Sequence, residues 1–200
     1  WEKIVAVGFR NKANRRFENK SVKEIADALG KLPEEAAMDL MLDEDFHVCG
    51  IFHEILEDDV MTVIKHPLAA IVSDAEAEAP YDQTGKSATH PRAYGTFPRV
   101  LKRYVFEKGL FSLEEAIRKM TSWPAQRIGL EDRGVLAKGM AADVVVFDPK
   151  TVRDHATFED SHRYPEGIVH VIVNGTMTIE NGEHTRERAG LVLKHRPRIA

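Results

Sequence analysis

Residues 68–74, Leu-Ala-Ala-Ile-Val-Ser-Asp, combine a short apolar run with a carboxylate that follows it directly. An apolar run of this length without polar alternation predicts a strand that is buried on both faces, as in a parallel sheet. In α/β folds the ligand lies beyond the carboxyl ends of such strands. Asp74 is therefore the first candidate site residue. The alternative is that Asp74 only hydrogen-bonds the turn after the strand, as Asp often does.

The segments on either side of this run alternate between strand and helix patterns. Val48–Phe52 has the composition of a strand, and residues 57–65 begin acidic and end on a lysine, as a helix aligned with its own dipole does. Residues 75–96 predict a long loop, after which apolar residues recur at helical spacing up to Gly109. The order strand, helix, strand, loop, helix over residues 45–108 predicts a parallel sheet and the α/β class.

The first 45 residues predict one strand and two helices. Residues 4–9 are apolar and predict a buried strand, while Ser21 and Glu24 have the spacing of a capping box before a helix that ends at Gly30. A second helix is predicted from Pro33 to Leu42. Its inward-facing residues are expected to be Ala36, Ala37, Leu40 and Met41.

The composition changes near residue 130, and the remaining chain has strand signals separated by turns. Val144–Phe147 is an apolar run, Ile168–Val173 alternates, and Asn174-Gly175 is a type I′ hairpin signal. This part of the chain predicts a small antiparallel β module beside the α/β domain.

The charge balance and the single cysteine exclude several classes of function. The chain has 28 Lys and Arg against 32 Asp and Glu, a formal net charge of −4, which argues against a nucleic-acid partner. No apolar run approaches the roughly 18–20 residues of a membrane helix, so no membrane partner is expected. Cys49 excludes an intrachain disulfide, fits a reducing, cytoplasmic compartment, and is expected to be a small buried hydrophobe. Because the chain begins at Trp1 without a methionine, we expect a truncated chain or a piece of a longer protein.

Residues 90–99, His-Pro-Arg-Ala-Tyr-Gly-Thr-Phe-Pro-Arg, gather imidazole, guanidinium and phenol groups on a segment stiffened by two prolines. The guanidinium of Arg92 is a planar fork suited to a carboxylate. The alternative is a solvated loop in which Arg99 pairs with an acidic neighbour. The nine histidines form no recognisable metal motif, because the His53-Glu54 pair lacks the second histidine of HExxH. The residues taken alone therefore yield no complete catalytic set.

Several segments that occur in order carry a resemblance to a known family. These segments are Ile71–Asp74, His90–Arg99, Leu113–Thr121, Arg133–Asp143, Val144–Pro149, Thr157–Asp160 and Tyr164–Ile168. Together they resemble the C-terminal part of the N-acyl-D-amino-acid deacylases, or D-aminoacylases, of the amidohydrolase superfamily. The likeness extends over nearly the whole chain, from the strand after Trp1 to the turn at Gly182–Thr185.

The resemblance implies an α/β fold that is the C-terminal portion of a metal-dependent (β/α)8 barrel plus a small β-sandwich module. Residues 1–128 would be the last strands and helices of the barrel, and residues 129–200 the C-terminal strands of the sandwich. Val48–Phe52 and Leu68–Val72 would be the last two barrel strands. The implied reaction is hydrolysis of the amide bond of an N-acyl-D-amino acid to a carboxylate and a free D-amino acid by a metal-activated water.

The resemblance also implies roles for individual residues. Asp74 matches the family's catalytic aspartate, which would bind or approach the metal, take the proton from the attacking water and deliver it to the departing amine. Arg92 matches the arginine that holds the substrate α-carboxylate, and His90 in the same motif would help to shape the site. Ala75 stands where the family has glycine, and residues 76–88 form a long acidic insertion, so substrate specificity does not carry over.

The family's other metal ligands, a His-x-His, a cysteine or carboxylate and two mid-barrel histidines, would lie upstream of Trp1. One carboxylate does not make a zinc site, so we expect Zn2+ in the complete protein and none on this chain alone, which would be inactive. Its partner would be the N-terminal part of the same protein or another copy of the chain. Two alternatives remain: a non-catalytic assembly or interaction module with unpaired sheet edges, and a cyclic-amide hydrolase of the same superfamily.

Overall fold

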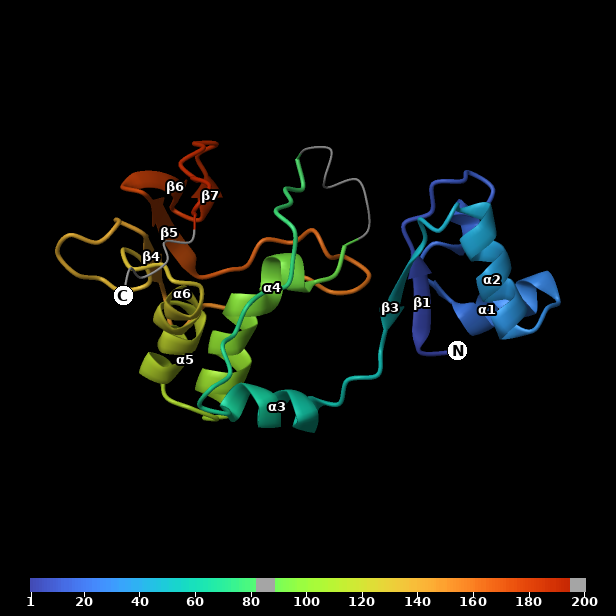
Figure 1. Ribbon diagram of the computed structural model, residues 1–200, viewed down its shortest axis with the longest axis horizontal. Helices are drawn as coiled ribbons and strands as arrows, with labels where there is room; N and C mark the ends of the chain where they lie inside the picture. The colour runs from blue at the N-terminus through green and yellow to red at the C-terminus, as the bar shows by residue number, and fades with distance from the viewer. Residues whose placement is uncertain (82–88, 195–200) are drawn as a thin grey trace. The chain divides into compact units, whose positions relative to one another are not determined.

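The computed structural model describes residues 1–81 and 89–194, which form a mixed α/β structure in two compact units (Figure 1). The first unit comprises Trp1–Val60 and Glu78–His90, and the second comprises Met61–Ala77 and Pro91–Ala200. The domains predicted at residues 1–128 and 129–200 stay a prediction. Within the described ranges, no helix is both long and apolar enough to cross a membrane.

The first unit packs two helices against a three-stranded sheet of order β2-β1-β3 (Figure 1). Its elements are β1 (Ile4–Val7), η1 (Arg15–Phe17), β2 (Lys20–Ser21), α1 (Val22–Leu29), α2 (Pro33–Asp43) and β3 (Cys49–Phe52). A further helix, α3 (Glu57–Lys65), spans the boundary between the units, with the bounds that its charge pattern predicts.

The ends of α1 confirm the predicted capping box and stop. The Ser21 hydroxyl accepts a hydrogen bond from the Glu24 backbone N–H at 3.2 Å, and the Glu24 carboxylate accepts one from the Ser21 N–H at 2.8 Å. Gly30 ends the helix with a φ of 65°, a left-handed conformation that costs glycine little. These contacts span three or four residues, which is why the sequence pattern reveals them.

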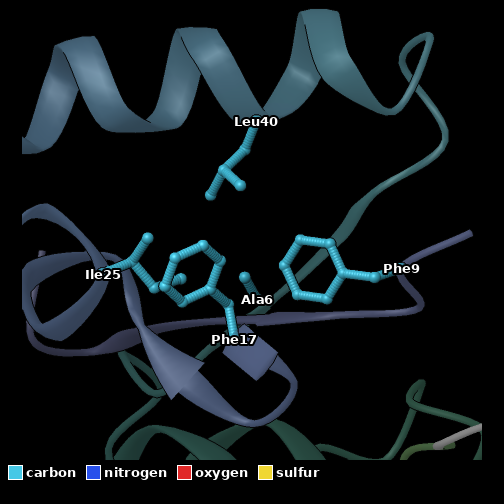
Figure 2. Packing of buried hydrophobic residues seen from close by; sticks show 5 residues of the cluster. All are labelled: Ala6, Phe9, Phe17, Ile25 and Leu40. Carbon is cyan, nitrogen blue, oxygen red and sulfur yellow. The ribbon is translucent and has the colours of Figure 1, made fainter. Parts of the chain in front are cut away.

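A cluster of buried apolar side chains forms the core of the first unit. Figure 2 shows Leu40 projecting from its helix toward the rings of Phe9 and Phe17, with Ile25 and Ala6 beside them. Met41, which the sequence predicts to face inward, is exposed. Ala36 and Leu40 are four residues apart and share the buried face of α2, whereas Met41 lies about 100° further round the helix.

The predicted parallel sheet is wrong for the described residues, because every strand pair among them is antiparallel. In the first unit, β1 and β3 pair with Ile4 opposite Phe52 and Val7 opposite Cys49. A parallel sheet requires cover on both faces, but most of β3 is exposed, and an antiparallel sheet tolerates one solvated face. Cys49 is correspondingly exposed and not the buried hydrophobe that was expected, since β3 is an edge strand of this sheet.

The second unit contains a group of helices and a four-stranded antiparallel sheet of order β4-β5-β6-β7. Its elements are α4 (Arg92–Arg99), the π-helix η3 (Val100–Glu107), α5 (Leu113–Met120), α6 (Ser122–Arg127), β4 (Val144–Phe147), β5 (Ile168–Val173), β6 (Thr176–Glu180) and β7 (Glu183–His184). The sheet confirms the predicted antiparallel pattern of the tail. Its β5–β6 turn is the predicted two-residue hairpin, with φ of 49° at Asn174 and 81° at Gly175.

The predicted loop over residues 75–96 is too long at its C-terminal end, because α4 begins at Arg92. The helical spacing up to Gly109 is confirmed, although η3 has the wider π geometry. Pro98 lies just before η3, and its missing N–H and bulky ring prevent the regular hydrogen-bond pattern at that point. Residues 82–88 of the acidic insertion lie outside the described residues.

The predicted strand over Leu68–Val72 is also wrong, since this segment has no regular secondary structure. Leu68 and Val72 are exposed, while Ile71 between them is buried. The backbone of this segment is bonded to α5 and α6 and not to neighbouring strands, as described below for the site.

Glu44, directly after α2, fixes the loop that follows β1. Its carboxylate accepts hydrogen bonds from the backbone N–H of Arg10 at 2.7 Å and of Asn11 at 3.0 Å, and from the Asn14 side-chain amide at 2.8 Å. Burial alone raises the pKa of Glu44, but the hydrogen bonds from Asn11, Asn14 and Arg10 outweigh burial and hold this pKa below its ordinary value.

Glu44→Gln is expected to lower the free energy of unfolding of the first unit by about 2 kcal/mol at pH 7, because the amide cannot accept all three charge-assisted bonds. A carboxyl with a lowered folded-state pKa stabilises the fold above its unfolded pKa of about 4.3 and loses this contribution as the pH falls through the folded value. The difference between the variant and the wild type should therefore shrink toward pH 3. Hydrogen exchange of the β1 backbone amides measures the free energy of unfolding of both proteins at pH 7 and at pH 3.

The matched control is Glu34→Gln, since Glu34 lies exposed in the first turn of the same helix. This change should alter stability by no more than about 0.5 kcal/mol. A Glu44→Gln deficit that is as large at pH 3 as at pH 7 would contradict the assigned role of the charge.

Candidate functional site

Two of the predicted site residues lie together in the second unit. The Arg92 Nη1 atom is 2.9 Å from the Asp74 Oδ2 atom, an ion pair between residues that are far apart in the chain. The Asp74 side chain is 81 % exposed and that of Arg92 is 44 % exposed, so both groups are accessible from solvent. An exposed pair of this kind contributes at most about 1 kcal/mol to stability, which makes a purely structural role weak.

Arg92 is positioned by the helix that it begins. Pro91 precedes it, and the fixed φ of proline suits the start of a helix. Two residues further along α4, the buried Tyr94 hydroxyl lies 3.0 Å from Nδ1 of His162. The Tyr94 ring also meets that of Tyr164 edge to face, with centroids 5.6 Å apart. The polar and aromatic contacts of Tyr94 thus fix the helix turn that carries the guanidinium.

A second anchor holds the same helix from its far end. Arg99 donates from Nε to Asp154 Oδ2 at 2.8 Å. The alternative of a solvated loop in which Arg99 pairs with an acidic neighbour is therefore met only in the ion pair, because Arg99 lies in a helix and its partner is distant in sequence. Gly95 packs against that partner so closely that an added Cβ would lie 3.1 Å from the Asp154 Cβ. The small residue at this position lets α4 approach Asp154.

Asp74 has a left-handed backbone conformation with a φ of 50°. A non-glycine residue with positive φ is uncommon, although Asp tolerates this region better than most residues. Ala75 does not share the positive φ, so alanine suits this position without backbone strain. Strained residues of this kind cluster at functional sites.

His90, the third predicted site residue, lies two positions before Arg92 in the chain and is partly exposed. It belongs to the first unit, whereas Asp74 and Arg92 belong to the second. Its role in shaping the site stays a prediction.

The segment that leads to Asp74 is held by side chains of α5 and α6. The consecutive carbonyls of residues 66–69 all accept hydrogen bonds from these two helices. Arg118 Nη2 donates to Pro67 O at 3.2 Å, Trp123 Nε1 donates to Leu68 O at 3.0 Å, and Lys119 Nζ donates to the carbonyls of the two outer residues. These bonds replace the sheet hydrogen bonds that the predicted strand would make.

Lys119 is the most buried member of this group, with its side chain 1 % exposed. Burial lowers the pKa of Lys119, the carboxylate of Glu115 raises it and Arg118 lowers it further, so the net shift is downward. The nearest carboxylate oxygen, on Glu115, is 3.8 Å from Nζ and beyond hydrogen-bond distance. Backbone carbonyls are therefore the acceptors that offset the burial of this ammonium.

Sequence reasoning did not single out Lys119, although one signal was present. Ala116 and Lys119 are three residues apart in the helix that Ser112 caps, so they share a face, and Ala116 faces inward. A cation on the apolar face of an amphipathic helix is seldom left without acceptors.

The described residues do not make up a metal centre. Within residues 1–81 and 89–194, no three His, Cys, Asp or Glu side chains are grouped closely enough to hold a metal ion. Asp74 supplies one carboxylate, and its neighbour in the site is a guanidinium, which repels a cation. A zinc site needs at least three protein ligands, so the residues present do not fit one by themselves.

The family model of the amidohydrolase family matches residues 13–179, which include the Asp74–Arg92 pair and most of both units. This chain belongs to the amidohydrolase family. The match also covers α5, α6, β4, β5 and most of β6, so it extends well beyond the site.

Two deacylases from one organism are similar to most of this chain. D-aminoacylase from Alcaligenes xylosoxydans xylosoxydans is 43 % identical over 144 residues, covering 72 % of this chain and 28 % of the relative. N-acyl-D-aspartate deacylase from the same organism is 38 % identical over 174 residues, covering 84 % of this chain and 33 % of the relative. The chain thus spans about a third of the length of these relatives.

The crystal structure of another deacylase also matches this chain. The crystal structure of N-acyl-D-glutamate deacylase from Bordetella bronchiseptica contains zinc and a phosphonate inhibitor that mimics the tetrahedral intermediate. It matches this chain with a TM-score of 0.76 and 34 % identity, over 88 % of this chain and 34 % of the other. The relatives therefore include a deacylase whose crystal structure contains zinc.

Asp74→Asn is expected to change the free energy of unfolding by no more than about 0.5 kcal/mol, because its ion pair with Arg92 is solvent-exposed and asparagine tolerates the left-handed conformation. The matched comparison is Asp154→Asn, since Asp154 is 15 % exposed and holds Arg99. That change should cost about 1–2 kcal/mol through the lost charge-assisted bond. Urea denaturation of both variants measures the difference, and an Asp74→Asn loss as large as that of Asp154→Asn would reveal a structural role for the Asp74 ion pair.

Proposed function

We propose that the protein to which this chain contributes hydrolyses N-acyl-D-amino acids to a carboxylate and a free D-amino acid. In this proposal Asp74 moves the proton and Arg92 binds the substrate α-carboxylate. The observation that carries it is the 2.9 Å approach of these two side chains within one unit, in a chain of the amidohydrolase family with deacylase relatives.

The same proposal assigns the two parts of this chain to two domains of the complete protein. Residues 1–128 would supply the last strands and helices of a (β/α)8 barrel, and residues 129–200 the C-terminal strands of a small β-sandwich. The structural match to the Bordetella bronchiseptica deacylase, over 88 % of this chain, supports this assignment. The remaining two thirds of such a protein would come from the N-terminal part of the same polypeptide.

Asp74 has the chemistry that amide hydrolysis requires of a proton carrier. When water attacks the amide carbon, a proton must leave the water oxygen, and the amine departs only after its nitrogen gains a proton. A carboxylate accepts the first proton as a base and returns it as an acid, so the two transfers balance. The exposure of Asp74 makes its carboxylate accessible to such a substrate.

Arg92 supplies a planar guanidinium with several N–H donors in fixed geometry, which matches an α-carboxylate better than a lysine ammonium does. Its distance from Asp74 places the anchoring and proton-transfer groups a few ångströms apart. In an N-acyl-amino acid the α-carboxylate and the amide nitrogen are attached to the same carbon. The spacing of the two side chains therefore suits one substrate that contacts both.

Zinc belongs to the same proposal for the complete protein, since the Bordetella bronchiseptica relative was solved with zinc. The residues described here do not complete a zinc site, so the other ligands must come from outside them. The 200-residue chain alone is expected to retain well under one zinc per molecule after dialysis against buffer, because a single carboxylate binds zinc weakly. Plasma mass spectrometry measures the content, and one tightly held zinc per chain would contradict this expectation.

The activity itself is tested on the protein expressed from its complete coding sequence. We expect turnover of N-acetyl-D-amino acids and little or none of the L enantiomers. Asp74→Ala should lower kcat by at least about 100-fold, the range of a lost general acid or base. Arg92→Lys should mainly raise KM, because a lysine cannot make the bidentate contact with a carboxylate.

The control variant is Lys102→Met, since Lys102 lies on η3 and pairs with Glu107 outside the site. It should retain wild-type kinetics. An Asp74→Ala variant within tenfold of the wild type would refute the proton-transfer role. Turnover of ring amides instead of linear D-substrates would favour the cyclic-amide hydrolase, and inactivity on both would favour an assembly module.

A further inference from the structure

We propose that Lys119 is a positioning residue for Asp74. Its buried ammonium fixes the backbone of residues 66–71, and the end of that segment sets where the Asp74 carboxylate lies. The inference rests on the proposed role of Asp74 in proton transfer, and goes beyond it by naming the group that orients this side chain.

Lys119 holds the segment from both of its ends. Its Nζ atom donates to His66 O and, at 3.0 Å, to Ala69 O, while its own backbone carbonyl accepts from the Ile71 N–H at 2.9 Å. One residue of α5 therefore bonds three backbone groups of an irregular segment. Asp74 follows Ile71 by only three residues.

Packing alone does not explain a lysine at this position. Withdrawing an ammonium from water costs several kcal/mol unless its hydrogen bonds are replaced, and an apolar residue of similar volume avoids this cost. The acceptors that offset the cost at Lys119 belong to the segment before Asp74. The buried charge therefore specifies the path of this backbone.

Little else on the segment itself determines its path. Ile71 is buried, but Leu68 and Val72 are exposed, so apolar burial along the segment is small. Trp123 adds one donor, from Nε1 to Leu68 O at 3.0 Å. Hydrogen bonds from α5 and α6 thus hold this segment in place, as hydrogen bonds to neighbouring strands hold a regular strand.

The position of the carboxylate is sensitive to this path. Asp74 has a φ of 50°, so its side chain leaves the backbone in a direction set by a conformation that most residues avoid. A displacement of about 1 Å in a reacting group can lower a rate by about 100-fold. Loosening residues 66–71 should therefore affect proton transfer more than substrate binding, because Arg92 is anchored separately through Tyr94 and Arg99.

The test compares three variants of the protein expressed from its complete coding sequence, with N-acetyl-D-amino acids as substrates. Lys119→Met keeps the volume and removes the donor, and is expected to lower kcat at least about tenfold with KM within about threefold. Trp123→Phe removes one indole N–H from the same segment at little change in shape, and should lower kcat by a smaller factor. Lys102→Met removes a partly exposed lysine outside the site and should leave both constants unchanged.

Hydrogen exchange of the peptide that covers residues 68–74 gives a second readout that needs no activity. In Lys119→Met, exchange of this peptide should accelerate at least about tenfold relative to peptides from β5 and β6, whose exchange reports on global opening. If Lys119→Met is poorly folded, the same exchange measurement is made on Lys119→Gln, which removes the charge and shortens the side chain while keeping a polar group at this position.

The proposal fails if kcat per folded molecule stays within twofold of the wild type in Lys119→Met, or if exchange accelerates equally in all peptides. A rise in KM at constant kcat also overturns it, because it places the effect on substrate binding. If the wild-type protein turns over no N-acyl-D-amino acid, the proposed function fails, and the exchange of residues 68–74 alone then decides whether Lys119 positions this segment.

Discussion

A buried ammonium that bonds to backbone carbonyls determines the path of the chain into the candidate site. Lys119 on α5 bonds the carbonyls of His66 and Ala69 and, through its own backbone, the amide of Ile71. The segment has no strand partner, so these bonds satisfy backbone groups that a sheet would otherwise satisfy. Asp74, with its left-handed backbone and its ion pair with Arg92, lies three residues beyond Ile71.

In the first unit a buried carboxylate, in place of an ammonium, bonds several backbone groups of one loop. Glu44 gathers the backbone N–H groups of Arg10 and Asn11, as Lys119 gathers carbonyls in the second unit. In each case a charged side chain at a helix, or directly after one, bonds several backbone groups of an irregular segment. An ionised partner strengthens such hydrogen bonds, so one residue can hold several backbone groups. Removing the charged residue breaks all of these hydrogen bonds together.

The family relationship and the geometry contribute different parts of the functional conclusion. The match over residues 13–179 establishes the amidohydrolase family, and the deacylase relatives suggest the reaction class. The geometry adds that a carboxylate and a guanidinium lie 2.9 Å apart, each anchored through a different element. Among the residues that the structure describes, no group of His, Cys, Asp or Glu side chains completes a metal site.

The sequence by itself determined the elements whose contacts are local: the Ser21–Glu24 capping box, the ends of α3 and the Asn174-Gly175 hairpin. It also identified Asp74 and Arg92 as candidates, through their residue types and their resemblance to a family motif. Only the tertiary structure decided the antiparallel direction of β1 and β3, the absence of a strand at residues 68–72 and the hydrogen bonds of Lys119 to the carbonyls of residues 66 and 69. The physical reason is that caps and turns are formed by residues three or four positions apart. Strand pairing and the bonding of residues 66–71 depend instead on which distant donors and acceptors the fold brings within reach.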